Sequence, residues 1–183
     1  MTVSPDERDA ALESLASFES ERSLADIRIG DWSRPLCFIG YVRRVTPEWF
    51  LVTVVNDDWL LDGLLLIRID SLLSIELHDF DTVVRPYLLP LDEVDLVLDG
   101  AFWGAARALL QGRVGLVHPR DSEICWLGTD VQPGNTWAMN FVTSKGLEDG
   151  QHEVADGDVV AVQAGSCYQD FLEFVVLGSR PLV

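Results

Sequence analysis

The chain has 183 residues, of which 48% are hydrophobic, and it carries a formal net charge of −17. The charge is spread evenly, because residues 1–91 hold 16 acids and 8 bases and residues 92–183 hold 14 acids and 5 bases. No basic face or tail is available to meet phosphates or an anionic membrane, which argues against nucleic acid and membrane as partners. The acidity indicates either a soluble intracellular protein kept apart by self-repulsion, or a protein that meets a basic partner or mimics nucleic acid.

The location of the protein is predicted from its apolar runs and cysteines. No apolar run approaches the ~20 residues that a membrane-spanning helix needs, and the start of the chain, MTVSPDERDAALES, is unlike a signal peptide. The three cysteines lack metal-ligand spacing, and Cys37 and Cys125 are expected to be buried free thiols in apolar strands. These features predict a cytoplasmic protein.

The first half predicts a helix followed by five short strands. Ser4 and Glu7 form a capping box around Pro5, and an imperfect apolar stripe continues the helix to about Leu24, where it would cover one mouth of a small barrel. Apolar and β-branched segments separated by turn residues then predict strands at 27–29, 36–45, 49–55, 64–69 and 72–77.

The second half predicts the same order. Residues 91–98 fit either a short helix or an edge strand, and a helix is predicted at 101–111. Strands are predicted near 113–118, 124–131, 136–144, 151–155 and 159–164. Residues 166–172 are expected to form a closing turn with Tyr168 and Phe171 packed inward, and residues 174–177 a last strand.

The two halves align with each other as an internal repeat. At a shift of 88 positions four residues fall on identical residues: Cys37 on Cys125, Gly40 on Gly128, Trp49 on Trp137 and Val54 on Val142. Two β-rich stretches can also be aligned by chance, but the order of features favours a duplication. We therefore predict domains at 1–90 and 91–183, which pack on each other as a pseudo-dimer because units of this size are marginal alone.

Short motifs in each half resemble the signatures of Sm-like barrels, which also consist of a helix and five bent strands. In LLIRIDSLLSIEL, the apolar pairs around Arg68 and Asp70 are similar to the second Sm signature, although Ile69 replaces its glycine. In the second half, Met139-Asn140 is similar to the first signature, and 157–160 fits the second with Asp156 in place of arginine. The chain thus resembles uncharacterised bacterial Sm-like, SH3-like barrel proteins, in tandem.

Sm proteins hold an unstacked RNA base between an asparagine and an arginine. The resemblance therefore implies that an RNA-binding unit would carry both residues at the matching positions. The first half has Arg68 but Val52 at the asparagine position, and the second half has Asn140 but lacks the arginine. The resemblance therefore favours a protein that does not bind RNA.

No residue set predicts catalysis, a cofactor or a metal. His78, His118 and His152 are too far apart in sequence for paired ligands and are expected at the surface. Cys167 has no neighbouring base or cation to activate it and is expected to be structural. The many acidic pairs lie in predicted turns, where solvated carboxylates are usual.

Tryptophans supply the remaining candidates. Trp49 and Trp137 are expected in the core or rim of each barrel. Four further aromatic residues form the predicted interface. Trp32 and Trp59 lie in predicted loops and are expected to form an exposed apolar patch. Phe102 and Trp103 lie on the second predicted helix, where they either fill the seam between the units or are exposed.

These expectations predict a non-catalytic protein–protein interaction module with an unknown protein partner, for which the acidity makes a basic protein a candidate. Open strand edges also predict a capacity for self-association. Three rival functions are an Sm-like RNA-binding protein, a small hydrolase that uses Cys167 or an acidic cluster, and an immunity or inhibitor protein that meets a basic toxin.

Overall fold

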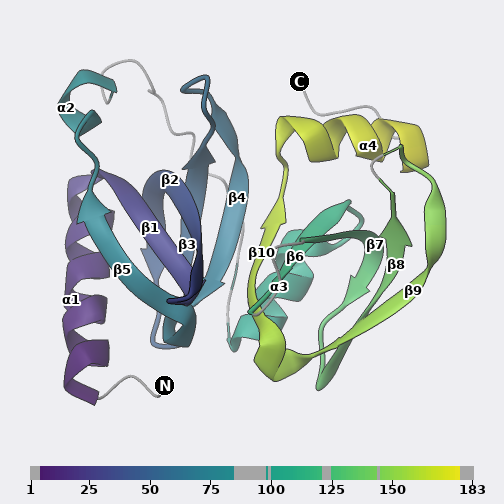
Figure 1. Cartoon of the computed structure of the whole chain (residues 1–183), viewed down its shortest axis with the longest axis horizontal. Coiled ribbons are helices and arrows are strands. Elements are labelled where there is room, and N and C mark those ends of the chain that lie inside the picture. Colours follow the sequence, from purple (N-terminus) through teal and green to yellow (C-terminus); the bar gives the residue numbers. More distant parts are fainter. Residues whose placement is uncertain (1–4, 85–97, 99, 121–124, 144, 178–183) are drawn as a thin grey trace. The chain divides into compact units, whose positions relative to one another are not determined.

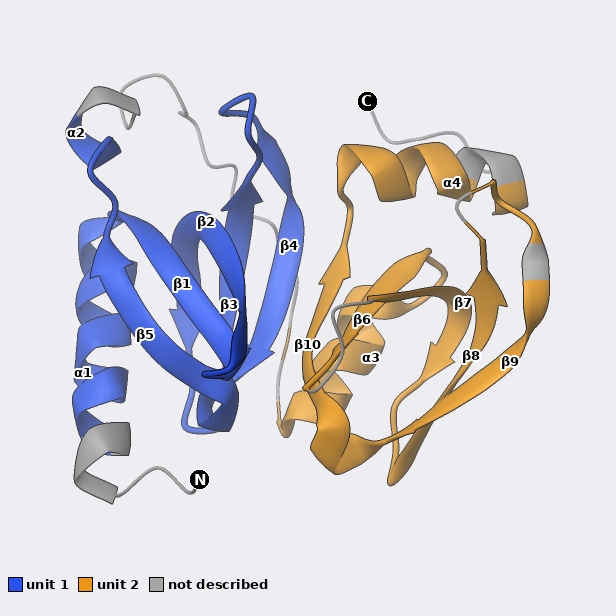
Figure 2. Cartoon of the chain, in the orientation of Figure 1, with its two compact units in different colours: residues 1–95 blue, residues 96–183 orange. Residues whose placement is uncertain are grey.

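The structure is a computed structural model, and it describes residues 5–84, 98, 100–120, 125–143 and 145–177. The protein is mainly β, as predicted, and the chain divides into two compact units, residues 1–95 and 96–183 (Figure 2). The division lies close to the predicted boundary at 90/91. The predicted capping box at Ser4 and the ambiguous segment 91–98, apart from Leu98, lie outside the described residues. None of the described helices is long and apolar enough to cross a membrane.

Unit 1 is a helix followed by a five-stranded antiparallel sheet (Figure 1). Its strands lie in the order β5-β1-β2-β3-β4, so the fifth strand returns to lie beside the first. Helix α1 packs on β2 and β5 through residues that include the fully buried Leu15. The elements are α1 (Pro5–Glu21), β1 (Leu24–Asp31), β2 (Arg34–Val45), β3 (Trp49–Val55), β4 (Leu61–Arg68), the 3-10 turn η1 (Ile69–Ser71), β5 (Leu72–Leu77) and α2 (Asp81–Val84).

Unit 2 has the same order of a helix, four strands, a 3-10 turn and a fifth strand, and it ends in an additional helix (Figure 1). Its sheet has the strand order β10-β6-β7-β8-β9, so here too the fifth strand lies beside the first. The elements are α3 (Phe102–Leu110), β6 (Gly115–Pro119), β7 (Trp126–Gln132), β8 (Thr136–Val142), β9 (Glu148–Ala155), η2 (Asp156–Asp158), β10 (Val159–Ala164) and α4 (Cys167–Leu177). The Sm-like identity of the units and their pairing as a pseudo-dimer stay predictions.

The second strand of each unit contains a glycine at a point where the backbone of the third strand comes too close for a side chain. A Cβ added at Gly40 would lie 2.5 Å from the carbonyl oxygen of Thr53 on β3, and one added at Gly128 would lie 2.8 Å from that of Asn140 on β8. Real Cβ atoms do not approach a carbonyl so closely, so neither position accepts a side chain without a shift of the neighbouring strand. Both glycines therefore let the second and third strands of their unit come close together.

The residue that leads into the first strand is clamped in the same way in both units. In unit 1, the Leu24 N–H donates to Asp81 Oδ1 at 2.6 Å, and the Leu24 carbonyl accepts from the N–H of His78 at 3.0 Å. In unit 2, the Val114 N–H donates to Glu173 Oε1 at 2.9 Å, and its carbonyl accepts from Gln169 Nε2 at 3.3 Å. The partner in every case belongs to the segment that follows the fifth strand.

Trp49 and Trp137, predicted to lie in the core or at the rim, are both fully buried and belong to the core of their units. The guanidinium of Arg44 lies over the Trp49 ring at 5.6 Å. The Trp137 ring lies 5.8 Å from that of Phe102, and its Nε1–H donates to Asp156 Oδ1 at 2.8 Å. Each tryptophan thus joins its third strand to other elements of the same unit.

The end of unit 2 differs from the prediction of a turn and a strand, because residues 167–177 form helix α4. Ser166 and Gln169 make a capping box: the Ser166 Oγ accepts the Gln169 N–H at 3.2 Å, and the Gln169 Oε1 accepts the Ser166 N–H at 3.0 Å. Tyr168 and Phe171 point outward, with exposed fractions of 46% and 61%, whereas Leu172 is buried. The inward packing expected for the two aromatic residues is therefore wrong.

Substitution of Gly40 and Gly128 tests whether the close strand approach at these glycines limits stability. Gly40→Ala and Gly128→Ala should each lower the free energy of unfolding by roughly 1–3 kcal/mol, because the new methyl group overlaps a backbone carbonyl. Gly157→Ala is the matched control, since its Cβ would meet nothing within 4 Å, and it should change stability by no more than about 0.5 kcal/mol. Urea denaturation followed by circular dichroism measures all three, and equal effects at the three sites would contradict the explanation.

The buried amide of Gln169 provides a second test. Its Nε2 donates to the carbonyls of Val114 and Gln163, at 3.3 and 2.7 Å, and the residue is fully buried. Gln169→Leu keeps the size but leaves these buried carbonyls short of a donor, so unfolding should become easier by roughly 1–3 kcal/mol. Phe171→Ser, at a nearby exposed position of the same helix, should cost no more than about 0.5 kcal/mol in the same urea titration.

Candidate functional site: an aromatic cluster on unit 1

The four predicted interface residues have different surroundings within their own units. Trp32 is 61% exposed in the turn between β1 and β2, and Trp59 is half-buried in the loop between β3 and β4. Trp103 is 48% exposed on α3, where it contacts Arg107 of the same helix at 5.6 Å. Phe102 is 3% exposed and packs on Trp137, so it belongs to the interior of unit 2.

Trp32 and Trp59 lie at opposite ends of the β1–β2 ladder, which corrects the expectation of a common patch. Trp32 follows the ladder's last pair, Asp31 with Arg34. Trp59 packs on a cluster that includes Leu24 and Tyr41, the pair at the other end. Seven residues of strand separate the two ends, or about 20 Å at the usual rise. The sequence singled out Trp59 correctly as a loop residue but gave it the wrong neighbour.

The loop that carries Trp59 has a defined conformation. Asn56 organises it: its side-chain Oδ1 accepts the N–H groups of Asp58 and Leu60, both at 3.0 Å, and its carbonyl accepts the Trp59 N–H at 2.9 Å. Trp59 has a φ of +61°, in the left-handed region that bulky side chains rarely occupy. The surrounding hydrogen bonds hold this unfavourable backbone, and such held outliers are frequent at functional positions.

Two residues after β5 complete an aromatic cluster with Trp59. The ring centroid of Trp59 lies 5.6 Å from that of His78 and 5.7 Å from that of Phe80, both nearly edge-to-face, and the His78 and Phe80 rings are 5.8 Å apart. These separations fall in the range that aromatic pairs prefer. We call Trp59, His78 and Phe80 the aromatic cluster.

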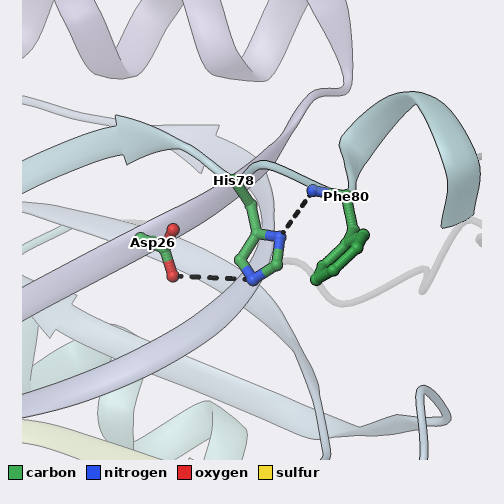
Figure 3. Close-up of polar contacts among 3 residues, drawn as sticks. All are labelled: Asp26, His78 and Phe80. Atoms are coloured by element: carbon green, nitrogen blue, oxygen red, sulfur yellow. Dashed lines mark hydrogen bonds and ion pairs between the residues drawn. The ribbon is translucent and has the colours of Figure 1, made fainter.

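The backbone around His78 fixes its ring (Figure 3). Its Nδ1 accepts the Phe80 N–H at 3.1 Å, and its Nε2 faces Asp26 Oδ1 at 3.8 Å. The side chain of His78 is only 12% exposed, whereas that of Asp26 is 45% exposed. The ring therefore joins the buried base of the cluster to a carboxylate at its rim.

The cluster has a buried base and an exposed top. Trp59 covers the apolar residues Leu24, Tyr41 and Val55. Phe80 is 53% exposed and Leu60, next to Trp59 in the chain, is 58% exposed. An apolar surface held on a rigid base is a feature of interaction sites rather than of reaction centres. Sequence reasoning considered His78 only as a surface histidine and did not consider Phe80, because both follow the last predicted strand of the unit, where no periodic pattern indicates contacts.

The other two histidines, His118 and His152, are predicted at the surface, but the first is buried and the second is half-buried. His118 on β6 is 7% exposed, and burial lowers its pKa to about 4, against a hydrogen bond with Gln163 that acts to raise it. His152 is half-buried between Trp126 and Phe141, with ring centroids at 5.3 and 4.7 Å. Within the described part of the chain, no three His, Cys, Asp or Glu residues gather as a metal site.

The cysteines also differ from expectation, since all three are free but exposed. At Cys125, partial burial of the thiol raises its pKa, which opposes formation of the reactive thiolate. Unit 2 also has an open cleft of about 410 Å³, lined by the end of α3 and part of β7, including Arg107 and Asp130. The residues that line this cleft do not combine a nucleophile with a base.

The positions that would hold a base in an Sm protein do not offer that chemistry here. Val52 of unit 1 is fully buried. In unit 2, Asn140 is held between Asp130 and Gln151, at 3.2 and 3.3 Å. Asp156, at the arginine position, accepts a hydrogen bond from Trp137 and repels a phosphate. Neither unit presents an asparagine and an arginine together at these positions.

Compared with known proteins, the chain matches no protein-family model, no curated protein and no solved structure. The fold and the site define a class: a mainly β protein of two five-stranded antiparallel units, each opened by a helix. Its most developed surface among the described residues is the aromatic cluster of unit 1.

The burial of His118 predicts a pH-dependent stability. Its pKa is about 4 in the folded protein and 6.5 when solvated, so between these values the unfolded chain binds more protons. The free energy of unfolding is therefore at its full value above about pH 6.5. It falls as the pH drops toward 4, in total by roughly 3 kcal/mol. His118→Gln should flatten the change in unfolding free energy between about pH 7 and about pH 5, measured by urea titration. His152→Gln is the control, and an unchanged slope in the His118 variant would contradict the assignment.

Proposed function

We propose that this protein is a non-catalytic interaction module of the bacterial cytoplasm, built from two tandem Sm-like barrels that pair as a pseudo-dimer. The aromatic cluster carries the proposal: Phe80 is 53% exposed, yet it rests on rings and a backbone that hydrogen bonds hold in place. Such preorganised aromatic anchors dominate the energetics of protein interfaces.

The shared architecture supports the proposed duplication. Both units have the same strand order, a glycine at the close approach of strands two and three, and a clamp on the residue that leads into strand one. A helix followed by five bent strands is also what the Sm-like resemblance implies. An RNA-binding role is disfavoured, because the base-holding pair is split between the units and the net charge is −17.

An immunity or inhibitor role is a special case of the same proposal, since it too requires an acidic surface that meets a protein. A hydrolase is disfavoured because the described residues show no base beside an activated nucleophile. The proposal therefore rests on binding, and its partner is a protein.

A comparative capture experiment tests the proposal. The full chain, Phe80→Ser and Phe171→Ser are each immobilised and exposed to lysate of the native cells, and retained proteins are quantified. Both phenylalanines are exposed, 53% and 61%, but only Phe80 belongs to the aromatic cluster. We expect a specific partner to be retained by the wild type and Phe171→Ser, and to be reduced roughly tenfold or more by Phe80→Ser. Equal retention by all three proteins would exclude the cluster as the binding surface.

A further inference from the structure

We infer that the aromatic cluster binds a protein segment that combines an apolar anchor with lysine or arginine. This inference rests on the proposed function and adds the chemistry of the partner. It follows from the charges that lie around the cluster and from the occupants that those charges disfavour.

Carboxylates dominate the segments that build the cluster. Six of them are at least partly exposed, in the Trp59 loop, at the start of β4, at the end of β5 and on β1: Asp26, Asp57, Asp58, Asp62, Glu76 and Asp79. Residues 56–62 and 76–81 contain no lysine or arginine. The arginines nearest to these segments along β1, β2 and the approach to β1 are Arg22, Arg28 and Arg43. The apolar surface is therefore bordered by an excess of negative charge.

Two of these carboxylates are placed directly opposite each other. Asp26 on β1 pairs with Glu76 on β5, and side chains at paired positions of antiparallel strands lie on the same face. Like charges in this arrangement repel. A cation from a partner would relieve this repulsion, so the free protein is poised to accept a lysine or arginine at this edge of the cluster.

The same charges argue against two further occupants. A second copy of this chain would place its own acidic border against the first, which is repulsive. The segment 85–97 of the same chain carries three carboxylates and one arginine, so it is also acidic. A basic segment with an aromatic or aliphatic side chain is the occupant that matches both the apolar top and the border. Charge complementarity of this kind mainly raises the association rate and selects the partner.

Peptide titration against the full chain tests the inference. Three short fluorescein-labelled peptides are compared: one alternates lysine with phenylalanine and leucine, one has glutamate for each lysine, and one has serine for each apolar residue. Fluorescence anisotropy should show binding of the first peptide only, weakening between about 0.05 and about 0.5 M salt as the charges are screened. Phe80→Ser should weaken it roughly tenfold or more, and Phe171→Ser should not.

The outcomes separate this inference from the proposed function. Equal binding of the lysine peptide to wild type and Phe80→Ser would reduce the effect to general attraction by an acidic protein and overturn the inference. If the glutamate peptide bound as well as the lysine peptide, an interaction site would remain in place but the need for a cation would be refuted. Concentration-dependent dimerisation in sedimentation, lost in Phe80→Ser, would show that a second copy is the occupant, and absence of binding by every peptide would also overturn it.

Discussion

Pairing of the fifth strand with the first determines the rest of each unit. Because β5 lies beside β1 and β10 lies beside β6, the chain leaves the sheet next to the residue that leads into the first strand. The N–H and the carbonyl of that residue, Leu24 or Val114, both bond to the exiting chain. A buried backbone group without a partner is costly, so the exiting segment is held at the end of the sheet.

The two units use this held segment differently. In unit 2 the segment is α4, whose Leu172 covers an apolar cluster that includes Val114 and Val142. In unit 1 the described part of the segment is 78–84, and an apolar cluster is covered by Trp59 from the neighbouring loop, with His78 and Phe80 packed against Trp59. A helix buries the end of one unit, whereas separate aromatic rings cover the other and remain partly exposed. The same architecture thus gives a closed end in unit 2 and the partly exposed aromatic cluster in unit 1.

The electrostatic character of the protein would give a binding surface at this cluster its selectivity. Apolar contact alone is poorly discriminating, because many partners can supply an aromatic or aliphatic side chain. An acidic border repels most soluble acidic proteins and this chain itself, and favours a basic segment. The neutral state of the buried His118 belongs to a different part of the molecule, in the core of unit 2, and concerns stability rather than recognition.

Sequence alone determined the β-rich class, the helix that opens each unit and the approximate strands, because these depend on local periodicity and turn residues. It also contained the Ser166–Gln169 capping box, which indicates the start of helix α4. This local signal predicts the structure of the segment better than the apolar run at 174–177, for which a strand is predicted. Tertiary structure alone decided that Trp59 meets His78 and Phe80 rather than Trp32, and that His118 is buried. Those outcomes depend on which strands pair and which ladder end a loop reaches, and contacts between residues some twenty positions apart leave no periodic trace in the chain.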